Sequence, residues 1–254
     1  MPTTLEVLFA PAEFNALNQR DLSDTVCVAF DVLRATSTMV TALGNGATAV
    51  IPVAEIPEAL AIRQRDPQVL LAGEREGLRI EGDLTGGITF DLGNSPREFT
   101  EAKVRRKTIV MTTTNGTRAL RACAAAHTVL LGSFLNLRAT AGFIEQLRPA
   151  HLLLVCSGTL DQAAYEDALG AGALCDFVWP AYSGGNIADS AHMARRLFQL
   201  EATNLSKAMA QSRNGRRLMA QPQLREDIPF CARREIVSLV AELEKDGSVR
   251  AQSS

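Results

Sequence analysis

The sequence has few of the side chains that bind transition metals. Its 254 residues include only three histidines, which are far apart in the chain, and five cysteines, none of them in a C-x-x-C pair. Most of the cysteines stand in apolar runs, which predicts reduced core thiols rather than disulfides or zinc ligands. A metal in this protein is therefore expected to be held by carboxylates, which favours Mg²⁺ over Zn²⁺.

An excess of charge and a long apolar run are also lacking. The net charge is -2 at pH 7, which gives no support to a nucleic-acid or membrane partner. No apolar run approaches the roughly 20 residues of a bilayer span, and the first residues have no basic region typical of a signal peptide. We expect a cytoplasmic protein, and the sequence leaves its oligomeric state open, a homodimer included.

The motifs of several phosphate-handling enzymes are missing as well. No G-x-x-x-x-G-K-[ST] occurs, which excludes a P-loop NTPase. A cysteine-nucleophile phosphatase needs C-x₅-R, but Gln162 stands six residues after Cys156, and a D-x-D phosphatase needs a carboxylate where Leu33 stands. No R-H-G nucleophile motif is present either. If the chain handles phosphate, metal-assisted chemistry with carboxylate ligands and anion-binding turns remains.

Strand and helix patterns alternate through the first 175 residues, and helical patterns dominate from 188 onward, including 236–243. No linker rich in Pro, Gly or Ser separates domains, and the tail after about Gly247 is predicted to be disordered. We predict one α/β domain over residues 1–254, a layered α/β/α fold with a mixed, largely parallel sheet and a helical C-terminal third. Strand patterns occupy 4–9, 26–30, 48–53, 69–72, 107–111, 128–131 and 151–155.

The stretch 26–39 contains the most informative strand-to-helix turn. An apolar strand ends at Asp31, and Thr36-Ser37-Thr38 supplies N-cap chemistry for a helix. Unpaired N–H groups at such a turn attract anions, and Arg34 can add a bidentate fork. A carboxylate beside an anion site favours a divalent cation between them. The alternative is that Asp31 only caps the helix and Arg34 is solvated.

A second turn of this kind follows the strand at 107–111. Its sequence T-T-T-N-G-T-R contains hydroxyl and amide groups that can donate to phosphate oxygens, and Gly116 lets the backbone come close. The alternative is a threonine-rich turn with ordinary capping.

A third turn, at 156–174, leads into a helix that carries Glu166 and Asp167 in its second turn. In an otherwise apolar segment this pair favours metal ligation or a buried ion pair with arginine. The small residues at 168–173 allow close backbone packing.

Two further segments flank these turns. The charged loop G-E-R-E-G-L-R-I-E-G at 73–82 leaves the end of a strand, where α/β sheets place ligands, although a solvated loop is the common alternative. Ser95-Pro96-Arg97-Glu98 predicts a helix start closed by a capping box.

Taken together, these motifs resemble the 2-phosphosulfolactate phosphatases, Mg²⁺-dependent enzymes associated with coenzyme M biosynthesis. One stretch departs from the family pattern, because D-L-T-G-G-I-T at 83–89 separates I-E-G from F-D-L-G-N-S-P. The matching stretches are D-V-L-R-A-T-S-T at 31–38, the loop at 73–82, F-D-L-G-N-S-P at 90–96, T-T-N-G-T-R-A at 113–119, C-S-G-T…E-D-A-L-G-A-G-A-L at 156–174 and S-R-N-G-R at 212–216.

The resemblance implies hydrolysis of 2-phosphosulfolactate, a phosphate monoester with a sulfonate and a carboxylate, to sulfolactate and phosphate. The implied catalytic residues are Asp31, Arg34 and Arg118, with Asp31 as nucleophile or metal ligand. The Mg²⁺ candidates are Asp31, Glu74 and Glu166, followed by Asp91 and Asp167. The implied substrate-binding residues are Thr36, Ser37, Arg75, Asn94, Arg97, Thr113, Asn115, Gly116, Thr117 and Arg213. The alternatives are a phosphatase for another small acidic metabolite and a non-catalytic anion-binding homologue whose insertion disables hydrolysis.

Overall fold

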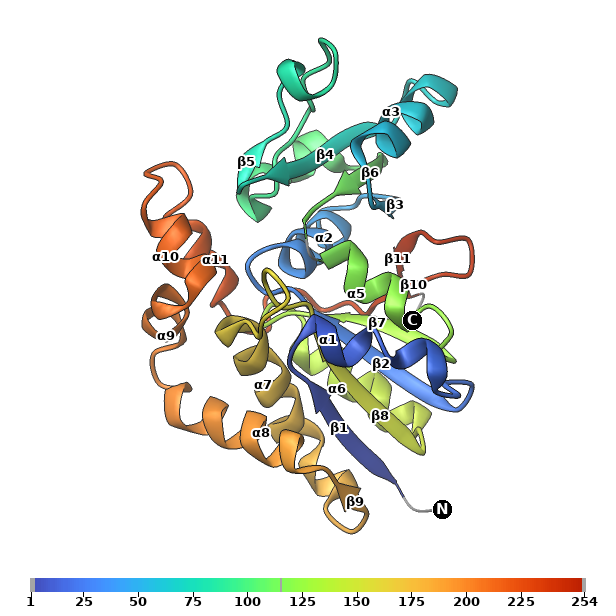
Figure 1. Ribbon diagram of the computed structural model, residues 1–254, viewed down its shortest axis with the longest axis vertical. Helices are drawn as coiled ribbons and strands as arrows, with labels where there is room; N and C mark the ends of the chain where they lie inside the picture. The colour runs from blue at the N-terminus through green and yellow to red at the C-terminus, as the bar shows by residue number, and fades with distance from the viewer. Residues whose placement is uncertain (1–2, 115, 253–254) are drawn as a thin grey trace.

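The computed structural model describes residues 3–114 and 116–252. Within them the chain forms an 11-stranded sheet in the order β5-β4-β6-β3-β11-β10-β7-β2-β8-β1-β9, with helices on both faces (Figure 1). The predicted layered α/β/α fold is confirmed. The strands are β1 (Thr4–Leu8), β2 (Thr25–Phe30), β3 (Ala49–Val53), β4 (Leu70–Arg75), β5 (Leu78–Arg79), β6 (Thr108–Thr112), β7 (Thr128–Gly132), β8 (His151–Cys156), β9 (Asn186–Ile187), β10 (Ala241–Leu243) and β11 (Val249–Ala251).

Two groups of parallel strands make up most of the sheet. One group is β4-β6-β3, and the other is β7-β2-β8-β1-β9. The antiparallel hairpin β10–β11 joins them, because β10 pairs with β7 and β11 pairs with β3. Because β2 and β8 are parallel neighbours, the residues that follow them lie at the same edge of the sheet. The strand β6 belongs to the other group, and the turn after it reaches the residues that follow β2 through the close approach of Gly116 to Asp31.

Helices and 3₁₀ turns cover the two faces of the sheet (Figure 1). None of the helices in the described ranges has the length and apolarity needed to cross a bilayer. The helices are α1 (Pro11–Phe14), α2 (Ala35–Gly44), α3 (Ile56–Arg65), α4 (Glu101–Val104), α5 (Gly116–Cys123), α6 (Leu137–Leu147), α7 (Tyr165–Tyr182), α8 (Asp189–Glu201), α9 (Leu205–Gln211), α10 (Arg213–Met219) and α11 (Asp227–Cys231), and the 3₁₀ turns are Leu17–Gln19, Gly82–Leu84 and Pro96–Glu98.

The core lies on both sides of the central strand β2, which is buried along its whole length. Val28 and Phe30 pack into one hydrophobic cluster, and Cys27 and Ala29 pack into another on the opposite face, as the two-residue period of a strand requires. All five cysteines are buried and free, so the prediction of reduced core thiols is confirmed. The close packing expected of the small residues in α7 is confirmed too, since a Cβ on Gly172 would lie 2.0 Å from the Ala194 carbonyl oxygen of α8.

The predictions for the C-terminal end were wrong in two places. Residues 236–243 form no helix and end in β10, and Val249–Ala251, in the tail predicted to be disordered, form β11. Ala241 and Val249 are fully buried and complete the sheet between β7 and β3. An apolar segment this short fits a strand or a helix equally well, so the unpaired edges of β3 and β7 decide its structure.

Candidate active site

Asp31 follows β2 and organises the turn into α2. Its Oδ1 accepts a hydrogen bond from the backbone N–H of Ala35 at 3.1 Å. The Thr36 hydroxyl accepts from the Asp31 N–H at 3.1 Å and donates to the Asp31 carbonyl oxygen at 3.0 Å. The prediction that a hydroxyl caps this helix is therefore wrong. Arg34 is the N-cap residue, and the Asp31 carboxylate accepts from the N–H of Ala35, the first residue of α2. Oδ2 of Asp31 has no hydrogen bond among the described residues.

Gly116, the first residue of α5, lies directly against this free oxygen. A Cβ on Gly116 would lie 2.8 Å from Asp31 Oδ2 and 2.7 Å from the Cβ of Ala35. Only glycine therefore lets the start of α5 approach the carboxylate this closely. Asn115, which the sequence also selected, lies outside the described residues.

Two more carboxylates come from α7, which begins at Tyr165, so Glu166 and Asp167 stand in its first turn and not its second as predicted. Both oxygens of Asp167 are occupied, since Oδ1 accepts from the Val32 N–H at 2.8 Å and Oδ2 from the Gly158 N–H at 3.1 Å. Asp167 thereby holds together the turns that follow β2 and β8. Glu166 uses only Oε1, which accepts from the Asn214 amide at 2.6 Å. Its Oε2 is buried and has no partner in the part of the chain that the structure describes.

The buried carboxylates Asp31, Glu166 and Asp167 form what we call the acidic cluster. Burial raises the pKa of Asp31 to about 7, and repulsion from Glu166 and Glu74 adds to the rise. Burial likewise raises the pKa of Glu166, and it raises that of Asp167 well above its usual value, with further repulsion from the other two carboxylates. Each group would be stabilised by a proton or a cation, and such carboxylates are typical of functional sites.

Glu74 ties β4 to the turn after β6. Its Oε1 accepts from the N–H and the hydroxyl of Thr114 at 3.0 and 2.9 Å, and its Oε2 accepts from the Gly77 N–H at 2.7 Å. A small cavity of about 40 Å³ is lined by Asp31 and by these hydrogen-bonded residues, Glu74, Gly77 and Thr114. Asn94 and Thr113 also line it, and the Asn94 Oδ1 and Thr113 Oγ1 are buried without a partner among the described residues. The Thr113 hydroxyl can donate to an oxyanion, and the Asn94 Oδ1 can accept from water or from a protonated ligand group.

Arg34 borders the same cavity and is held by a second buried group, which we call the brace: Arg34, Asp227 and Ser95. The Arg34 Nη1 donates to Asp227 Oδ2 at 2.6 Å, and Nη2 donates to the Gly77 carbonyl oxygen at 2.7 Å. The Ser95 hydroxyl donates to Asp227 Oδ1 at 2.6 Å. Arg34 is thus a buried partner of Asp227, and the alternative that it is solvated is wrong.

The brace also explains why the predicted capping box at Ser95 does not form. The Ser95 hydroxyl bonds Asp227 of α11, and the Glu98 carboxylate accepts from the Gly93 N–H at 3.0 Å instead of closing back onto Ser95. Pro96–Glu98 is consequently only a 3₁₀ turn.

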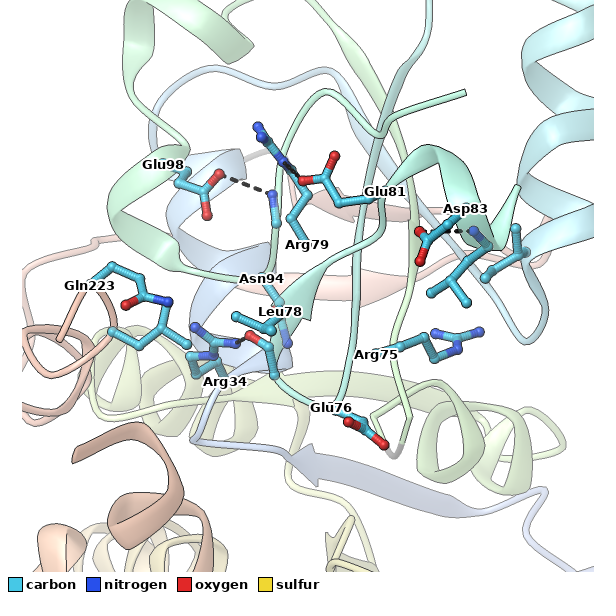
Figure 2. A pocket seen from close by; sticks show the side chains of 15 residues that line it. Arg34, Arg75, Glu76, Leu78, Arg79, Glu81, Asp83, Asn94, Glu98 and Gln223 are labelled. Carbon is cyan, nitrogen blue, oxygen red and sulfur yellow. Dashed lines mark hydrogen bonds and ion pairs between the residues drawn. The ribbon is translucent and has the colours of Figure 1, made fainter. Parts of the chain in front are cut away.

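Beyond the cavity lies a larger groove of about 980 Å³, which shares Arg34, Gly77 and Asn94 with it. Figure 2 shows Arg34 and Gln223 on one side of this groove and Asp83 on the other. The inserted segment 83–89 reaches the groove through Asp83 and Leu84 and is otherwise exposed.

Three of the predicted anion-binding arginines lie near the site with polar partners. Arg75 lines the groove and donates to the Glu74 carbonyl oxygen at 2.8 Å and to the Thr112 hydroxyl at 3.2 Å. The Arg97 Nη1 lies 3.6 Å from Asp227 Oδ1. Arg213 donates to the Thr159 carbonyl oxygen at 3.1 Å and to the Gln162 side chain.

Several other predicted site residues are engaged elsewhere. Arg118 forms an exposed ion pair with Asp161 at 3.1 Å. Asp91 accepts from Arg63 and from the Leu71 N–H, so the structure does not bring it to the acidic cluster. The predicted hydroxyls other than Thr113 donate to backbone carbonyl oxygens within their own turns, namely Thr36 to Asp31, Ser37 to Val32 and Thr117 to Thr113.

Sequence reasoning missed four residues of the site: Ser95 as a partner of Asp227, Asp227 itself, Asn214 and Arg217. Asn214 and Arg217 line the small cavity from α10. The S-R-N-G-R stretch at 212–216 was a signal for Asn214, but only Arg213 was selected from it. Asp227 carried no such signal, because a lone aspartate before Ile-Pro is indistinguishable from a surface residue.

The fold and the site define an α/β protein with a small polar cavity among buried carboxylates, an arginine and polar groups that have no partner among the described residues. A model of the 2-phosphosulpholactate phosphatase family matches residues 13–246, and the chain belongs to this family of phosphoric monoester hydrolases. The resemblance of the sequence motifs is thereby confirmed.

Relatives from three bacteria carry the name "Probable 2-phosphosulfolactate phosphatase". The chain is 40% identical to that of Caldanaerobacter subterraneus subsp. tengcongensis over 240 residues, which are 93% of this chain and 95% of the relative. It is 38% identical to that of Pseudothermotoga lettingae over 248 residues, 97% and 98% of the two chains. It is 36% identical to that of Caldicellulosiruptor saccharolyticus over 228 residues, 87% and 90% of the two chains.

Proposed function

We propose that this protein hydrolyses 2-phosphosulfolactate to sulfolactate and phosphate with Mg²⁺ as its cofactor. This is a reaction of coenzyme M biosynthesis. The names of the relatives support the substrate. The observation that carries the proposal is a small cavity lined by Asp31, next to an acidic cluster in which one carboxylate oxygen each of Asp31 and Glu166 has no hydrogen-bond partner among the described residues. Carboxylate oxygens without a hydrogen-bond donor can bind a cation, and a bound cation can in turn bind a phosphate oxygen.

The donor set is compatible with Mg²⁺ held by Asp31 and Glu166. Each has one oxygen without a partner, whereas Glu74 and Asp167 use both of theirs on backbone and hydroxyl donors. Among the described residues no three carboxylate, histidine or thiol side chains converge as a ligand set. Mg²⁺ is commonly bound by one or two carboxylates, with water and substrate phosphate as the other ligands. When bound, it would neutralise the acidic cluster and polarise a phosphoryl oxygen.

The residues around the cavity would bind and orient the phosphate monoester. A guanidinium has five N–H donors, and the hydrogen bonds to Asp227 and Gly77 leave Arg34 with others for a phosphate oxygen. Thr113 and Asn94 add a hydroxyl and an amide on the same cavity. Water then attacks phosphorus, the bond from phosphorus to the alkyl oxygen breaks, and that oxygen leaves with a proton. Charge stabilisation must supply most of the acceleration, since uncatalysed monoester hydrolysis is extremely slow.

The test is release of inorganic phosphate from 2-phosphosulfolactate, phosphoglycolate and p-nitrophenyl phosphate, with Mg²⁺ and with EDTA. The proposal predicts Mg²⁺-dependent release that is selective for 2-phosphosulfolactate. Release from none of these substrates by the folded protein would contradict it and favour the non-catalytic anion-binding alternative.

The size of the groove favours a second candidate, a phosphatase for a larger acidic phosphometabolite. A groove of about 980 Å³ is far larger than 2-phosphosulfolactate needs. Metal-dependent turnover that is faster on larger acidic phosphate monoesters than on 2-phosphosulfolactate would select this candidate.

A further inference from the structure

The helix α10 contributes an arginine to the cavity that neither the sequence motifs nor the family resemblance marked. Arg217 lines the small cavity together with Asp31 and Glu74. Its neighbours on the same helix are engaged, since Arg213 donates to Thr159 and Arg216 donates to the Gln211 carbonyl oxygen. Arg217 forms no hydrogen bond or ion pair with any residue in the described ranges, so its charge is available at the cavity mouth.

The position of Arg217 is fixed by the segment between β4 and β5. A Cβ on Gly77 would lie 3.5 Å from both Nε and Nη2 of Arg217, so the guanidinium packs over the Gly77 backbone. Gly77 is itself held from two sides, because its N–H donates to Glu74 and its carbonyl oxygen accepts from Arg34. In Figure 1 the orange-red helix α10 lies across from β5, and Arg217 reaches Gly77 from α10.

Several arginines near the site are paired with a carboxylate, and Arg217 is paired with none that the structure describes. Arg34 is compensated by Asp227, Arg79 by Glu81 and Arg118 by Asp161. Of the two arginines that line the small cavity, Arg34 is paired with Asp227, whereas exposed Arg217 has no ion pair with any described residue. A small polyanionic substrate that places its phosphate against Arg34 and Thr113 would carry its other anion toward the cavity mouth.

We infer that Arg217 is a specificity-determining residue that binds the non-transferred oxyanion of the substrate, a sulfonate or carboxylate a few bonds from the phosphate ester. This inference rests on the proposed function, because it assumes a phosphate monoester in the cavity. It implies that the enzyme discriminates substrates with a second anion from simple alkyl or aryl phosphates. A planar guanidinium is well suited to this task, since it can bind either oxyanion in a bidentate manner.

The variant Arg217→Met keeps most of the side-chain volume and removes the charge. We expect kcat/KM for 2-phosphosulfolactate and phosphoglycolate to fall about 10- to 100-fold, mainly through KM. The fall for p-nitrophenyl phosphate, which has no second anion, should be at least about tenfold smaller, and Arg217→Lys should recover part of the loss. A larger loss on 2-phosphosulfolactate than on phosphoglycolate would assign the sulfonate, and equal losses the carboxylate.

Arg216→Met is the matched control, because Arg216 is the adjacent exposed arginine and does not line the cavity. It should change the ratio of kcat/KM for 2-phosphosulfolactate to kcat/KM for p-nitrophenyl phosphate by less than about twofold. Equal losses on all substrates in Arg217→Met, or no loss on any, would overturn the inference.

Calorimetric titration with sulfolactate and with inorganic phosphate separates this inference from the proposed function. Arg217→Met should weaken sulfolactate binding and leave phosphate binding much less affected. If the wild-type protein binds both anions but releases no phosphate from any ester, the proposed function fails while a selective weakening still supports the role of Arg217. Equal weakening toward both anions would overturn that role.

Discussion

The acidic cluster and the brace are two buried polar groups that reach the same small cavity, one through Asp31 and the other through Arg34, and they are built in opposite ways. In the brace, Asp227 accepts from Arg34 and Ser95 at 2.6 Å each, so charge and hydrogen bonds are both satisfied. In the acidic cluster, Asp31, Glu166 and Asp167 face one another, and Glu166 Oε2 has no partner among the described residues. The brace therefore stabilises the fold, whereas the acidic cluster destabilises it until a cation or protons bind.

The largest effect should come from removing a charge from the acidic cluster. In Asp31→Asn the amide oxygen can still accept from the Ala35 N–H, so the turn into α2 is retained. Without the charge, phosphate release should fall by about 10³-fold or more while the protein stays folded. Steady-state kinetics and circular dichroism check this. Asp176→Asn is the control. Asp176 lies farther along α7 and pairs with Arg195 of α8, so this variant should keep its activity. A near wild-type rate in Asp31→Asn would remove Asp31 from the site.

Breaking the brace should reduce stability more than any change in the acidic cluster does. Asp227→Asn leaves the buried charge of Arg34 uncompensated, which costs about 3–5 kcal/mol and lowers Tm by roughly 6–20 °C for a chain of this size. Arg97→Gln, which removes the exposed guanidinium 3.6 Å from Asp227, should cost under about 1 kcal/mol. Thermal unfolding measures both. Similar losses in the two variants would show that burial of the pair is not what matters.

The stability of the metal-free protein should depend on pH through the acidic cluster. Because the folded pKa of Asp31 is about 7 and its ordinary value is 3.8, folding favours the protonated form. The contribution of Asp31 to stability therefore falls as the pH rises from about 4 to about 7. In EDTA, Asp31→Asn should melt several degrees above wild type at about pH 8 and close to wild type at about pH 4. A difference that does not change with pH would contradict the raised pKa that burial and the neighbouring carboxylates give Asp31.

The smallest effect is expected at Arg118, an arginine outside both groups. It forms an exposed ion pair with Asp161, so Arg118→Ala should change stability by under about 1 kcal/mol and kcat/KM by less than about tenfold. Kinetics on 2-phosphosulfolactate measure this. A fall in kcat of two orders of magnitude would show instead that Arg118 acts in the transition state, in keeping with the catalytic role that the resemblance implies.

The parts of the fold and site that could be predicted are those written into contiguous stretches. The strand at Val26–Phe30 is apolar throughout because both of its faces are buried, and such a run points to the polar residue that ends it, Asp31. The hydroxyl-rich turn at Thr113 and the acidic pair at Glu166 follow strand ends in the same way.

What could not be predicted depends on contacts between distant segments. Ser95 and Asp227 are 132 positions apart, and Ser95 is equally good as a local helix cap, so only the packed chain determines its partner. The segment 236–243 is too short for its apolar period to separate strand from helix, and the gap between β7 and β3 decides it. Arg217 becomes distinctive only because the arginines around it have partners.

Calorimetric titration of the metal-free protein with Mg²⁺ at about pH 8 tests most directly whether the acidic cluster holds a cation. We compare wild type, Glu166→Gln and the Asp176→Asn control. We expect one Mg²⁺ site in wild type and in the control, weakened at least about tenfold in Glu166→Gln because the unpartnered Oε2 no longer carries charge. Equal Mg²⁺ affinity in all three proteins, or no binding to wild type, would contradict the claim that the acidic cluster is built to hold a cation.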